Sequence, residues 1–302
     1  MTKFDISVVI PTYKRPRLVI RCLNSFLKQN FSQNRFEILV VDDGSGDETG
    51  DQIRAWKQRN KIINLTYISQ ENAGPASARN RGIEKAKAEI IAFTDDDCEV
   101  DFDWLSAVFE YLKNNLNKLG VGGITYTDPA KTTPLTSQIS NSIEIDFPTC
   151  NVAYRASILE EIGGFDETYP VTNEDIDITW RILEKGEIGH EKKMRVKHPP
   201  RRDSFIKTIK GVRNLEGEFI LWERLTERYK KEHIHPLYFL FFHYTLKLSV
   251  KRLVKATPYL AKNPFINLWL LVILISERVY LLYLLPGFIY RSYIRRCKKN
   301  NE

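Results

Sequence analysis

Three adjacent aspartates, Asp95, Asp96 and Asp97, follow an apolar run at residues 90–94 in the segment FTDDDCEV. Alternate residues of a strand face the same way, so we expect Asp95 and Asp97 to point at one ligand and Asp96 to point elsewhere. Adjacent carboxylates repel one another unless a cation is present. A hard divalent ion, held by carboxylates and substrate phosphates, would remove that repulsion. The segment predicts a metal site, and a solvated acidic turn capping a helix near Asp103 is the alternative.

A second pair of carboxylates, Asp42 and Asp43, follows the apolar run at residues 36–41 and leads through a Gly/Ser turn toward a helix. An aspartate at this place could accept the imide N–H of a uracil or thymine ring, or hold a ribose. The alternative role is N-capping, but Ser45 and Asp47 are better placed for it. This favours a ligand role for Asp43.

The segment ENAGPASARNRG places Arg79 and Arg81 on or just before a helix. A guanidinium there could reach a base or a phosphate. Either arginine could instead be an ordinary solvated charge on the helix surface.

The elements that must position these side chains are short apolar runs alternating with amphipathic helical patterns. The runs cover residues 6–10, 36–41, 65–68 and 90–94, and the helical patterns cover residues 18–29, 49–58 and 76–86. Continuous apolar strands separated by helices indicate a parallel sheet covered on both faces, an α/β unit of Rossmann type. Ligands of such sheets bind beyond the carboxyl ends of the strands, which is where Thr12, Tyr13 and the aspartates lie.

Beyond residue 120 the pattern is less regular, and we expect this region to complete the same domain. A Thr/Pro-rich loop is predicted at residues 127–136, a short strand at 149–154, a helix at 174–184 and a strand-like run at 194–197. The helix carries the acidic segment Asn173-Glu174-Asp175, and His198 follows the last run.

Six segments occur in a characteristic order: VVIPTYKRP, FEILVVDDGSGDET, ENAGPASARNRG, FTDDDCEV, CNVAYRASILEEIGGFDE and NEDIDITWRI. In this order and spacing, over about residues 5–200, the sequence resembles the family-2 glycosyltransferases with the GT-A fold. The resemblance implies a mixed, mostly parallel, Rossmann-like sheet flanked by helices. It also implies a nucleotide-sugar donor, a divalent metal and inversion at the anomeric carbon.

Carried over motif by motif, the resemblance implies roles for individual residues. The nucleotide sugar would be bound by Pro11, Thr12, Tyr13, Asp43, Arg79, Asp95 and Asp96, and Mn²⁺ or Mg²⁺ by Asp97 and Asp95, with His198 as a further candidate ligand. Asp175 would be the base, with Glu174 in reserve, because spacing alone cannot separate adjacent carboxylates. Arg181 would steady the carboxylates or the diphosphate, or form an ion pair with Asp177 at i,i+4.

The implied reaction is a single displacement. The base takes a proton from the acceptor hydroxyl as it attacks, and the metal neutralises the departing nucleoside diphosphate. UDP is the first choice of nucleotide, with TDP and GDP open, and the acceptor is a glycan or a lipid-linked molecule. Residues 149–167 would lie near the acceptor, where Gly163 and Gly164 make a turn that is also a helix C-cap.

The net charge of +7 is unevenly distributed along the 302 residues. Residues 1–190 carry 21 Lys and Arg against 29 Asp and Glu, whereas residues 191–302 carry 24 against 9. Such asymmetry indicates two functions in series. The four scattered cysteines form no CxxC pair, which argues against a structural zinc site or a disulfide framework and favours a reducing compartment. The apolar run at residues 6–11 is too short for a signal peptide.

We therefore expect a catalytic domain at residues 1–203, with a nucleotide-binding half (1–115) and an acceptor-binding half (116–203), and a helical, apolar and basic region at 204–302. Residues 265–290 are long enough to span a bilayer. Glu277 and Arg278 near their centre would cost about 2.5 to 3.5 kcal/mol each. The alternative is that two apolar pieces, residues 265–276 and 279–285, lie in the membrane interface or pack as a pair of short helices.

The aromatic and basic residues at 235–262 suit an anionic membrane surface. The basic tail at 291–299 is expected to stay cytosolic, which favours an interfacial or re-entrant arrangement over a single crossing. The expected location is the cytoplasmic face of a membrane. A soluble helical appendage that closes over the catalytic domain, or forms a dimer, is the alternative.

Other classes fit less well. A sugar-phosphate nucleotidyltransferase would need a Gly-rich, Arg/Lys-bearing loop after the first strand, and VVIPTYKRP has none. A dinucleotide oxidoreductase is disfavoured because no GxGxxG follows a predicted strand. Nucleic-acid binding is disfavoured by the long apolar runs in the basic third. An inactive relative acting as a membrane-bound scaffold would require idle carboxylates. The sugar, acceptor, linkage, pathway and oligomeric state stay open.

Overall fold

The structure is a computed structural model, which describes residues 4–61, 63–132, 136–137, 139, 147–169, 172–202, 215–224, 250, 254, 257 and 265–299. The chain divides into two compact units: Met1–Pro129 with Gln138–Pro199, and Ala130–Ser137 with Pro200–Glu302. Each is described by itself. The assignment of catalytic, acceptor-binding and membrane-associated parts to these ranges stays a prediction.

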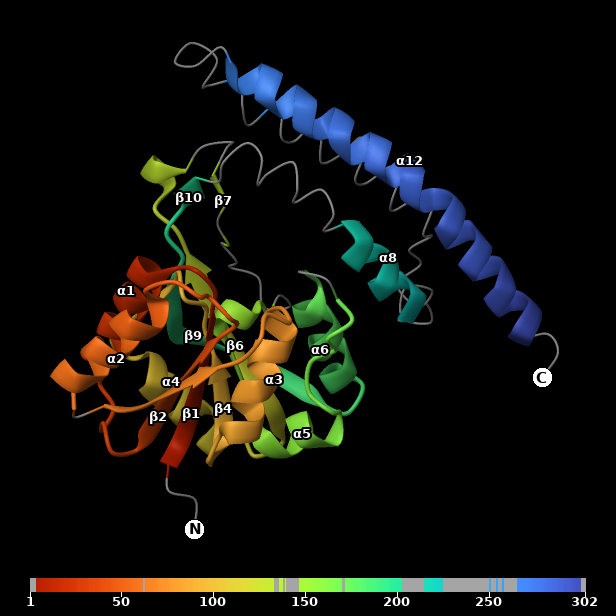
Figure 1. Cartoon of the computed structure of the whole chain (residues 1–302). Coiled ribbons are helices and arrows are strands. Elements are labelled where there is room, and N and C mark those ends of the chain that lie inside the picture. Colours follow the sequence, from red (N-terminus) through yellow and green to blue (C-terminus); the bar gives the residue numbers. More distant parts are fainter. Residues whose placement is uncertain are drawn as a thin grey trace. The chain divides into compact units, whose positions relative to one another are not determined.

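The first unit is built on a sheet whose first half is parallel (Figure 1). Its strands lie in the order β3-β2-β1-β4, with β1 at Phe4–Thr12, β2 at Phe36–Asp42, β3 at Asn64–Ser69 and β4 at Ala88–Phe93. The four predicted strands are thus confirmed. Thr12 pairs with Asp42, and Asp42 pairs with Ser69, so the carboxyl ends of three strands are in register.

Three predicted helices connect these strands and cover the sheet. They are α1 (Pro16–Phe26), α2 (Thr49–Arg59) and α3 (Pro75–Lys85). Pro16 and Pro75 stand at the first helical turn, where a missing N–H costs nothing and the fixed φ is already helical. Helix α3 packs closely on β1 at Gly82, which has no side chain. A Cβ at this position would come within 2.3 Å of the Val9 side chain.

The second half of the sheet is mixed. Beyond β4 the order continues β8-β6-β9-β5, with β8 at Val152–Arg155, β6 at Lys118–Tyr126, β9 at Glu187–Lys197 and β5 at Glu99–Val100. Strand β8 is antiparallel to both β4 and β6, whereas β6 and β9 are parallel. Helices α4 (Trp104–Asn114), α5 (Ala156–Glu161) and α6 (Glu174–Leu183) flank this half. The mixed, mostly parallel α/β sheet is the fold class expected from the sequence.

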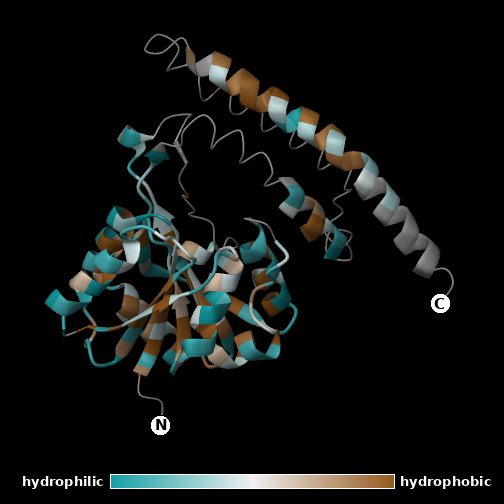
Figure 2. Cartoon of the chain, viewed as in Figure 1, coloured by the Kyte–Doolittle hydropathy of each residue, from teal (hydrophilic) through white to brown (hydrophobic). Residues whose placement is uncertain are grey.

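Two hydrophobic clusters cover the sheet, and hydrophobic residues recur along its strands (Figure 2). One includes Phe26 of α1 and Trp104 of α4, whose rings pack edge to face at 6.1 Å. The other includes Phe93 at the end of β4 and Phe165, with ring centroids 5.3 Å apart. Burial of both faces anchors the strand ends that carry the aspartates.

The second unit contains the strand pair β7 (Thr136–Ser137) and β10 (Arg201–Arg202) and the helices α8 (Leu215–Arg224) and α12 (Phe265–Lys299). Helix α12 packs on α8, where the Tyr280 hydroxyl donates to the Glu216 carboxylate. It runs unbroken past Glu277 and Arg278, so the alternative of two short apolar helices is wrong. The aromatic and basic segment at 235–262 lies outside the described residues, apart from 250, 254 and 257.

Within α12, Leu268–Gly287 is long and apolar enough to cross a membrane, with a mean hydropathy of 2.0. Hydrophobic residues dominate the first part of the helix in Figure 2. An exposed row recurs at intervals of three and four, which places it on one helix face. This row, called here the exposed apolar face, consists of Leu268, Leu271, Ile275, Val279 and Leu282.

Candidate functional site

The three adjacent aspartates lie in the turn that follows β4, because that strand ends at Phe93. The alternation of side chains along a strand therefore does not decide in which direction these aspartates point. Asp96 is buried and accepts hydrogen bonds from Thr12 Oγ1 (2.7 Å) and Arg15 Nη1 (2.8 Å). The same Arg15 nitrogen lies 3.4 Å from Asp97 Oδ2. Asp96 and Asp97 thus share one guanidinium, and the expectation that Asp96 points away from the ligand of its neighbours stays a prediction.

Burial raises the pKa of Asp96 to about 6, since it penalises the charged form. The Arg15 guanidinium opposes this shift, and the Asp97 carboxylate adds to it. Arg15 is thus a cation that the described structure places between two buried acids. The two residues predicted to line the nucleotide pocket differ in exposure. Thr12 is buried, whereas Tyr13 is 41% exposed, and Lys14 Nζ lies 5.1 Å from the centre of the Tyr13 ring.

Arg79 joins the aspartate turn to helix α6. Its Nη2 lies 2.9 Å from Asp95 Oδ1, and its Nη1 lies 2.8 Å from Glu174 Oε1, 95 residues further along the chain. Arg79 is only 4% exposed. Burial by itself would lower the pKa of Arg79, but the two carboxylates outweigh it and raise the pKa, so the side chain is a permanent cation. The predicted contact of Arg79 with a base stays a prediction.

The structure separates the two acids that spacing could not. Glu174 is buried in its ion pair with Arg79, whereas Asp175 is partly buried and, among the described residues, forms no ion pair. Burial first, and then the Glu174 charge, raise the pKa of Asp175 to about 7, while Arg79 opposes the shift. A carboxyl group that titrates near neutral pH has the proton affinity that a general base requires.

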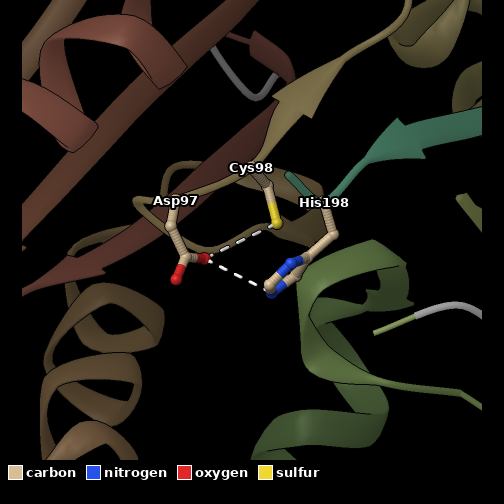
Figure 3. A group of neighbouring side chains, drawn as sticks. All are labelled: Asp97, Cys98 and His198. Carbon is tan, nitrogen blue, oxygen red and sulfur yellow. Dashed lines mark hydrogen bonds and ion pairs between the residues drawn. The ribbon is translucent and has the colours of Figure 1, made fainter. Parts of the chain in front are cut away.

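A group of possible metal ligands lies beside the aspartate turn (Figure 3). Ligand atoms of Asp97, Cys98 and His198 all lie within 4.8 Å of one another. Asp97 Oδ1 is 3.6 Å from His198 Nε2 and 3.9 Å from Cys98 Sγ. His198 is buried, and its Nδ1 has no hydrogen-bond partner among the residues described. Asp97 and His198, both predicted from the sequence, are thus neighbours, whereas the sequence analysis missed Cys98.

The donors of this group suit a hard or borderline divalent ion. A carboxylate suits hard ions such as Mg²⁺ and Mn²⁺, and an imidazole suits borderline transition-metal ions. The Cys98 thiol contacts Cys150, and this contact together with burial raises its pKa well above the usual value, so it stays a neutral thiol. The residues fit a metal held by Asp97 and His198. Asp95 turns to Arg79 instead, and its role as a ligand stays a prediction.

The carboxylate of Asp43 is saturated by a neighbouring loop. It accepts hydrogen bonds from Gln70 Nε2 (2.8 Å), Asn72 Nδ2 (3.0 Å) and the backbone N–H groups of Ala73 and Gly74 (both 2.9 Å). A carboxylate offers about four acceptor positions, so these donors occupy all of them. Asp43 holds residues 70–74 in place, and its contact with a base stays a prediction.

The other predicted positions are structural in their described contacts. Asp47 accepts from the N–H of Thr49, the first residue of α2, at 2.9 Å, and the N-cap residue itself is Glu48. Arg181 bonds Asp177 at 2.8 Å and donates to the carbonyls of Ile162 and Gly164. These contacts match the ion-pair interpretation of Arg181. Pro11 lies in β1, one residue before Thr12.

Comparisons with known proteins identify the family and the fold. A family model described as "Glycosyl transferase family 2" matches residues 7–163, just over half of the chain. The glycosyltransferase AglE of Haloferax volcanii is 28% identical over 190 residues, 60% of this chain and 62% of that protein. The poly(ribitol-phosphate) beta-N-acetylglucosaminyltransferase TarS of Staphylococcus aureus is 37% identical over 98 residues, 32% of this chain and 16% of TarS. The chain therefore spans less than two thirds of these relatives.

Solved structures with the same fold are also found. The mannosyltransferase PcManGT from Pyrobaculum calidifontis, in complex with GDP-Man and Mn²⁺, has a TM-score of 0.64 at 20% identity and matches 92% of this chain and 87% of that one. S. aureus TarS 1-349 in complex with UDP has a TM-score of 0.56 at 20% identity and matches 75% and 72%. The GT-A fold expected from the resemblance is confirmed. The chain belongs to glycosyl transferase family 2.

Proposed function

We propose that the chain transfers a sugar from a nucleoside diphosphate sugar to a hydroxyl group of a glycan or lipid-linked acceptor, with inversion at the anomeric carbon. One observation carries the proposal: Arg79 binds both Asp95, close to the candidate metal ligand Asp97, and Glu174, next to the candidate base Asp175. Two acidic motifs far apart in the sequence therefore meet at one arginine. Family membership supports sugar transfer as the chemistry.

Asp175 would act as the base. An acceptor hydroxyl is a poor nucleophile, and a carboxylate within hydrogen-bond reach removes its proton as it attacks the anomeric carbon. Asp175 lies in the first turn of α6, where burial and the Glu174 charge raise its pKa to about 7 and so give it the required proton affinity. Glu174 is the weaker candidate because its carboxylate is held by Arg79.

Asp97 and His198 would hold the divalent ion. Mn²⁺ or Mg²⁺, when bound there, supplies Lewis-acid stabilisation of the departing diphosphate. Arg15 contacts the carboxylates of Asp96 and Asp97 and adds positive charge next to the proposed metal site. UDP is our first choice of nucleotide, because the TarS structures contain UDP and UDP-GlcNAc, and GDP follows because PcManGT contains GDP-Man.

The second unit would hold the enzyme at the cytoplasmic face of an anionic membrane. The support is the exposed apolar face of α12 and the excess of basic residues after residue 190. Apolar area buried in the interface and attraction to anionic lipids act together in such binding. A lipid-linked acceptor, or a growing polysaccharide, would be met there.

A donor screen tests the enzymatic proposal. The full chain is incubated with UDP, TDP or GDP, each with and without Mn²⁺ or Mg²⁺, and its Tm is measured. One nucleotide should raise Tm only in the presence of the metal, because binding to the folded state alone stabilises it. The corresponding UDP-sugars are then screened for metal-dependent release of UDP. Failure of every nucleotide to bind would overturn the proposal.

Vesicle sedimentation tests the membrane proposal. The full chain should sediment with phosphatidylglycerol vesicles and much less with phosphatidylcholine vesicles. Replacing Leu271 and Ile275 of the exposed apolar face by Gln should weaken the binding. Leu116→Gln is the matched control, since Leu116 is 78% exposed but belongs to the first unit. Complete release by salt alone would exclude an inserted segment.

A further inference from the structure

Helix α3 contacts both halves of the first unit through two consecutive residues, Arg79 and Asn80. Arg79 reaches Asp95 and Glu174, as described above. Asn80 reaches the turn that follows α5. The two side chains therefore connect the aspartate turn with the two segments, around residues 164–167 and 174–175, that lie on the proposed acceptor side.

The Arg79 contact requires the shape of a guanidinium. Each of its two terminal nitrogens bonds a different carboxylate, at 2.9 Å for Asp95 and 2.8 Å for Glu174. The planar fork holds both acids at a fixed separation, whereas the compact ammonium of lysine cannot reach two acids in this way. Because Arg79 is buried, water does not replace either bond. A movement of Asp95 is therefore transmitted to the first residue of α6.

The Asn80 contact is equally specific. Asn80 Oδ1 accepts from the Phe165 N–H, and its Nδ2 donates to the Phe165 carbonyl and to Glu167 Oε1, all at 2.8 Å. The chain approaches so closely here that a Cβ on Gly164 would lie 2.5 Å from Asn80 Oδ1. Gly164 also has a φ of +71°, which favours glycine. The amide and the glycine together hold this turn on α3.

We propose that Arg79 and Asn80 form a joint, called here the α3 joint. This joint fixes the position of the catalytic base Asp175 relative to Asp95, which lies on the side of the proposed sugar donor. Both are positioning residues that act through Glu174 and the turn at Phe165. This inference rests on the proposed function. Arg79 then has a role other than contact with the nucleobase. Through Arg79, a nucleotide bound on the donor side orders the N-terminus of α6, so that the catalytic base Asp175 is held in place when the donor is present.

Hydrogen exchange of the full chain measures this connection directly. Amides at residues 94–98 report on the donor side, and amides at 172–178 report on the base. Mn²⁺ with UDP should slow exchange in both segments of the unchanged protein. In Arg79→Gln, protection at 94–98 should persist while protection at 172–178 falls by at least about fivefold, the lower end of typical coupling between two sites.

Arg81→Gln is the matched control, because Arg81 lies on the same helix, is exposed and pairs locally with Glu84. It should leave both segments unchanged. Arg79→Lys keeps the charge but not the fork, so it should fold and still lose protection at 172–178. In the metal-free and nucleotide-free protein, Arg79→Gln should already speed exchange at 172–178, which tests the joint even if no nucleotide binds.

Steady-state kinetics should also separate positioning of the catalytic base from binding of the donor. A base displaced by about 1 Å costs about 10²-fold in rate, so Arg79→Lys should lower kcat for UDP release by about that factor while KM for the donor changes less than about threefold. Equal nucleotide-dependent protection at 172–178 in Arg79→Lys and the unchanged protein would overturn the inference. A raised KM with unchanged kcat would also overturn it, by making Arg79 a donor-binding residue. Loss of nucleotide binding in the unchanged protein would contradict the proposed function but not the joint.

Discussion

The carboxyl ends of β2 and β4 both carry buried aspartates, yet the surroundings of their carboxylates differ. Asp43 after β2 receives four hydrogen bonds of 2.8 to 3.0 Å from residues 70–74. Asp97 after β4 lies 3.4 Å from Arg15, 3.6 Å from His198 and 3.9 Å from Cys98. The first carboxylate is surrounded by amide donors, whereas the second lies among a cation and two side chains that can ligate metals.

We propose that this difference separates a structural acid, Asp43, from a metal ligand, Asp97. Backbone N–H and amide donors balance the charge of Asp43 within its own loop, so the carboxylate stabilises the fold without a cation. The contacts of Asp97 with Arg15 and His198 are longer than a good hydrogen bond, and a divalent ion would bind the carboxylate more tightly. We therefore propose different physical roles for the two similar DD segments, and the following substitutions test the distinction.

The largest effect is expected for Asp97→Asn. Losing the charge should abolish the metal-dependent rise in Tm with nucleotide and lower UDP release by about 10³-fold or more, because metal stabilisation of the leaving group is worth several kcal/mol. The free energy of unfolding without metal should fall less than in Asp43→Asn, because Asp43 accepts four hydrogen bonds of 2.8 to 3.0 Å from residues 70–74. A variant that retains full metal-dependent nucleotide binding would remove Asp97 from the ligand set.

Asp43→Asn should give the reverse pattern. The amide NH₂ of asparagine must face either the donors of one carboxylate oxygen or those of the other, which leaves two partly exposed donors without this acceptor. The free energy of unfolding should fall by about 3 kcal/mol, measured by urea denaturation. Asp47→Asn is the control, because Asp47 is exposed and the hydrogen bond described for it, from the Thr49 N–H, is local. If both variants lose the same stability, the loop role of Asp43 is wrong.

A third acid, Asp175, is expected to make stability depend on pH. Its pKa is raised to about 7 in the folded state from an ordinary value of 3.8. Between these values the folded state keeps a proton that the unfolded state loses, so stability falls as pH rises through this window. A tenfold difference in proton affinity between the two states corresponds to about 1.4 kcal/mol, and Asp175→Asn should remove at least that much of the decline.

Denaturation of both proteins at pH 4 and pH 8 measures this effect. Asp96, whose pKa is about 6, titrates in an overlapping range and is present in both, so the difference between the two proteins isolates Asp175. Asp175→Asn should also stop UDP release while nucleotide binding is retained. Parallel stability curves for the two proteins would show that Asp175 does not titrate in this window.

The smallest effect is expected for Cys98→Ala. Because the thiol is neutral and lies against Cys150, a hard ion gains little from it, and the affinity for Mn²⁺ with nucleotide should change less than about threefold. Calorimetry with Cys22→Ala as the buried-cysteine control checks this. A loss of about tenfold or more in Cys98→Ala alone would make the thiolate a ligand and shift the site toward softer metals.

Local pattern predicted the first half of the sheet well, because burial on both faces leaves continuous apolar strands. It did not predict β6, whose sequence KLGVGGITY contains three glycines. The structure gives the reason: a Cβ on Gly120 would lie 2.4 Å from the Tyr154 ring, and one on Gly122 would lie 2.5 Å from the Phe147 ring. These glycines make room for large side chains from distant segments, so their pattern has no local meaning.

The sequence by itself determined the order of strands and helices, the placement of aspartates at strand ends, and the family, because periodicity and motif order are properties of neighbouring residues. Only the tertiary structure decided which donors each acid receives. Arg79 and Glu174 are 95 residues apart, and Asp43 is bonded by a loop about 30 residues away. The charge state and the bonding of a carboxylate depend on these distant partners. The kind of chemistry could therefore be predicted from the residue types, whereas a role for each acid could be proposed only from the tertiary structure.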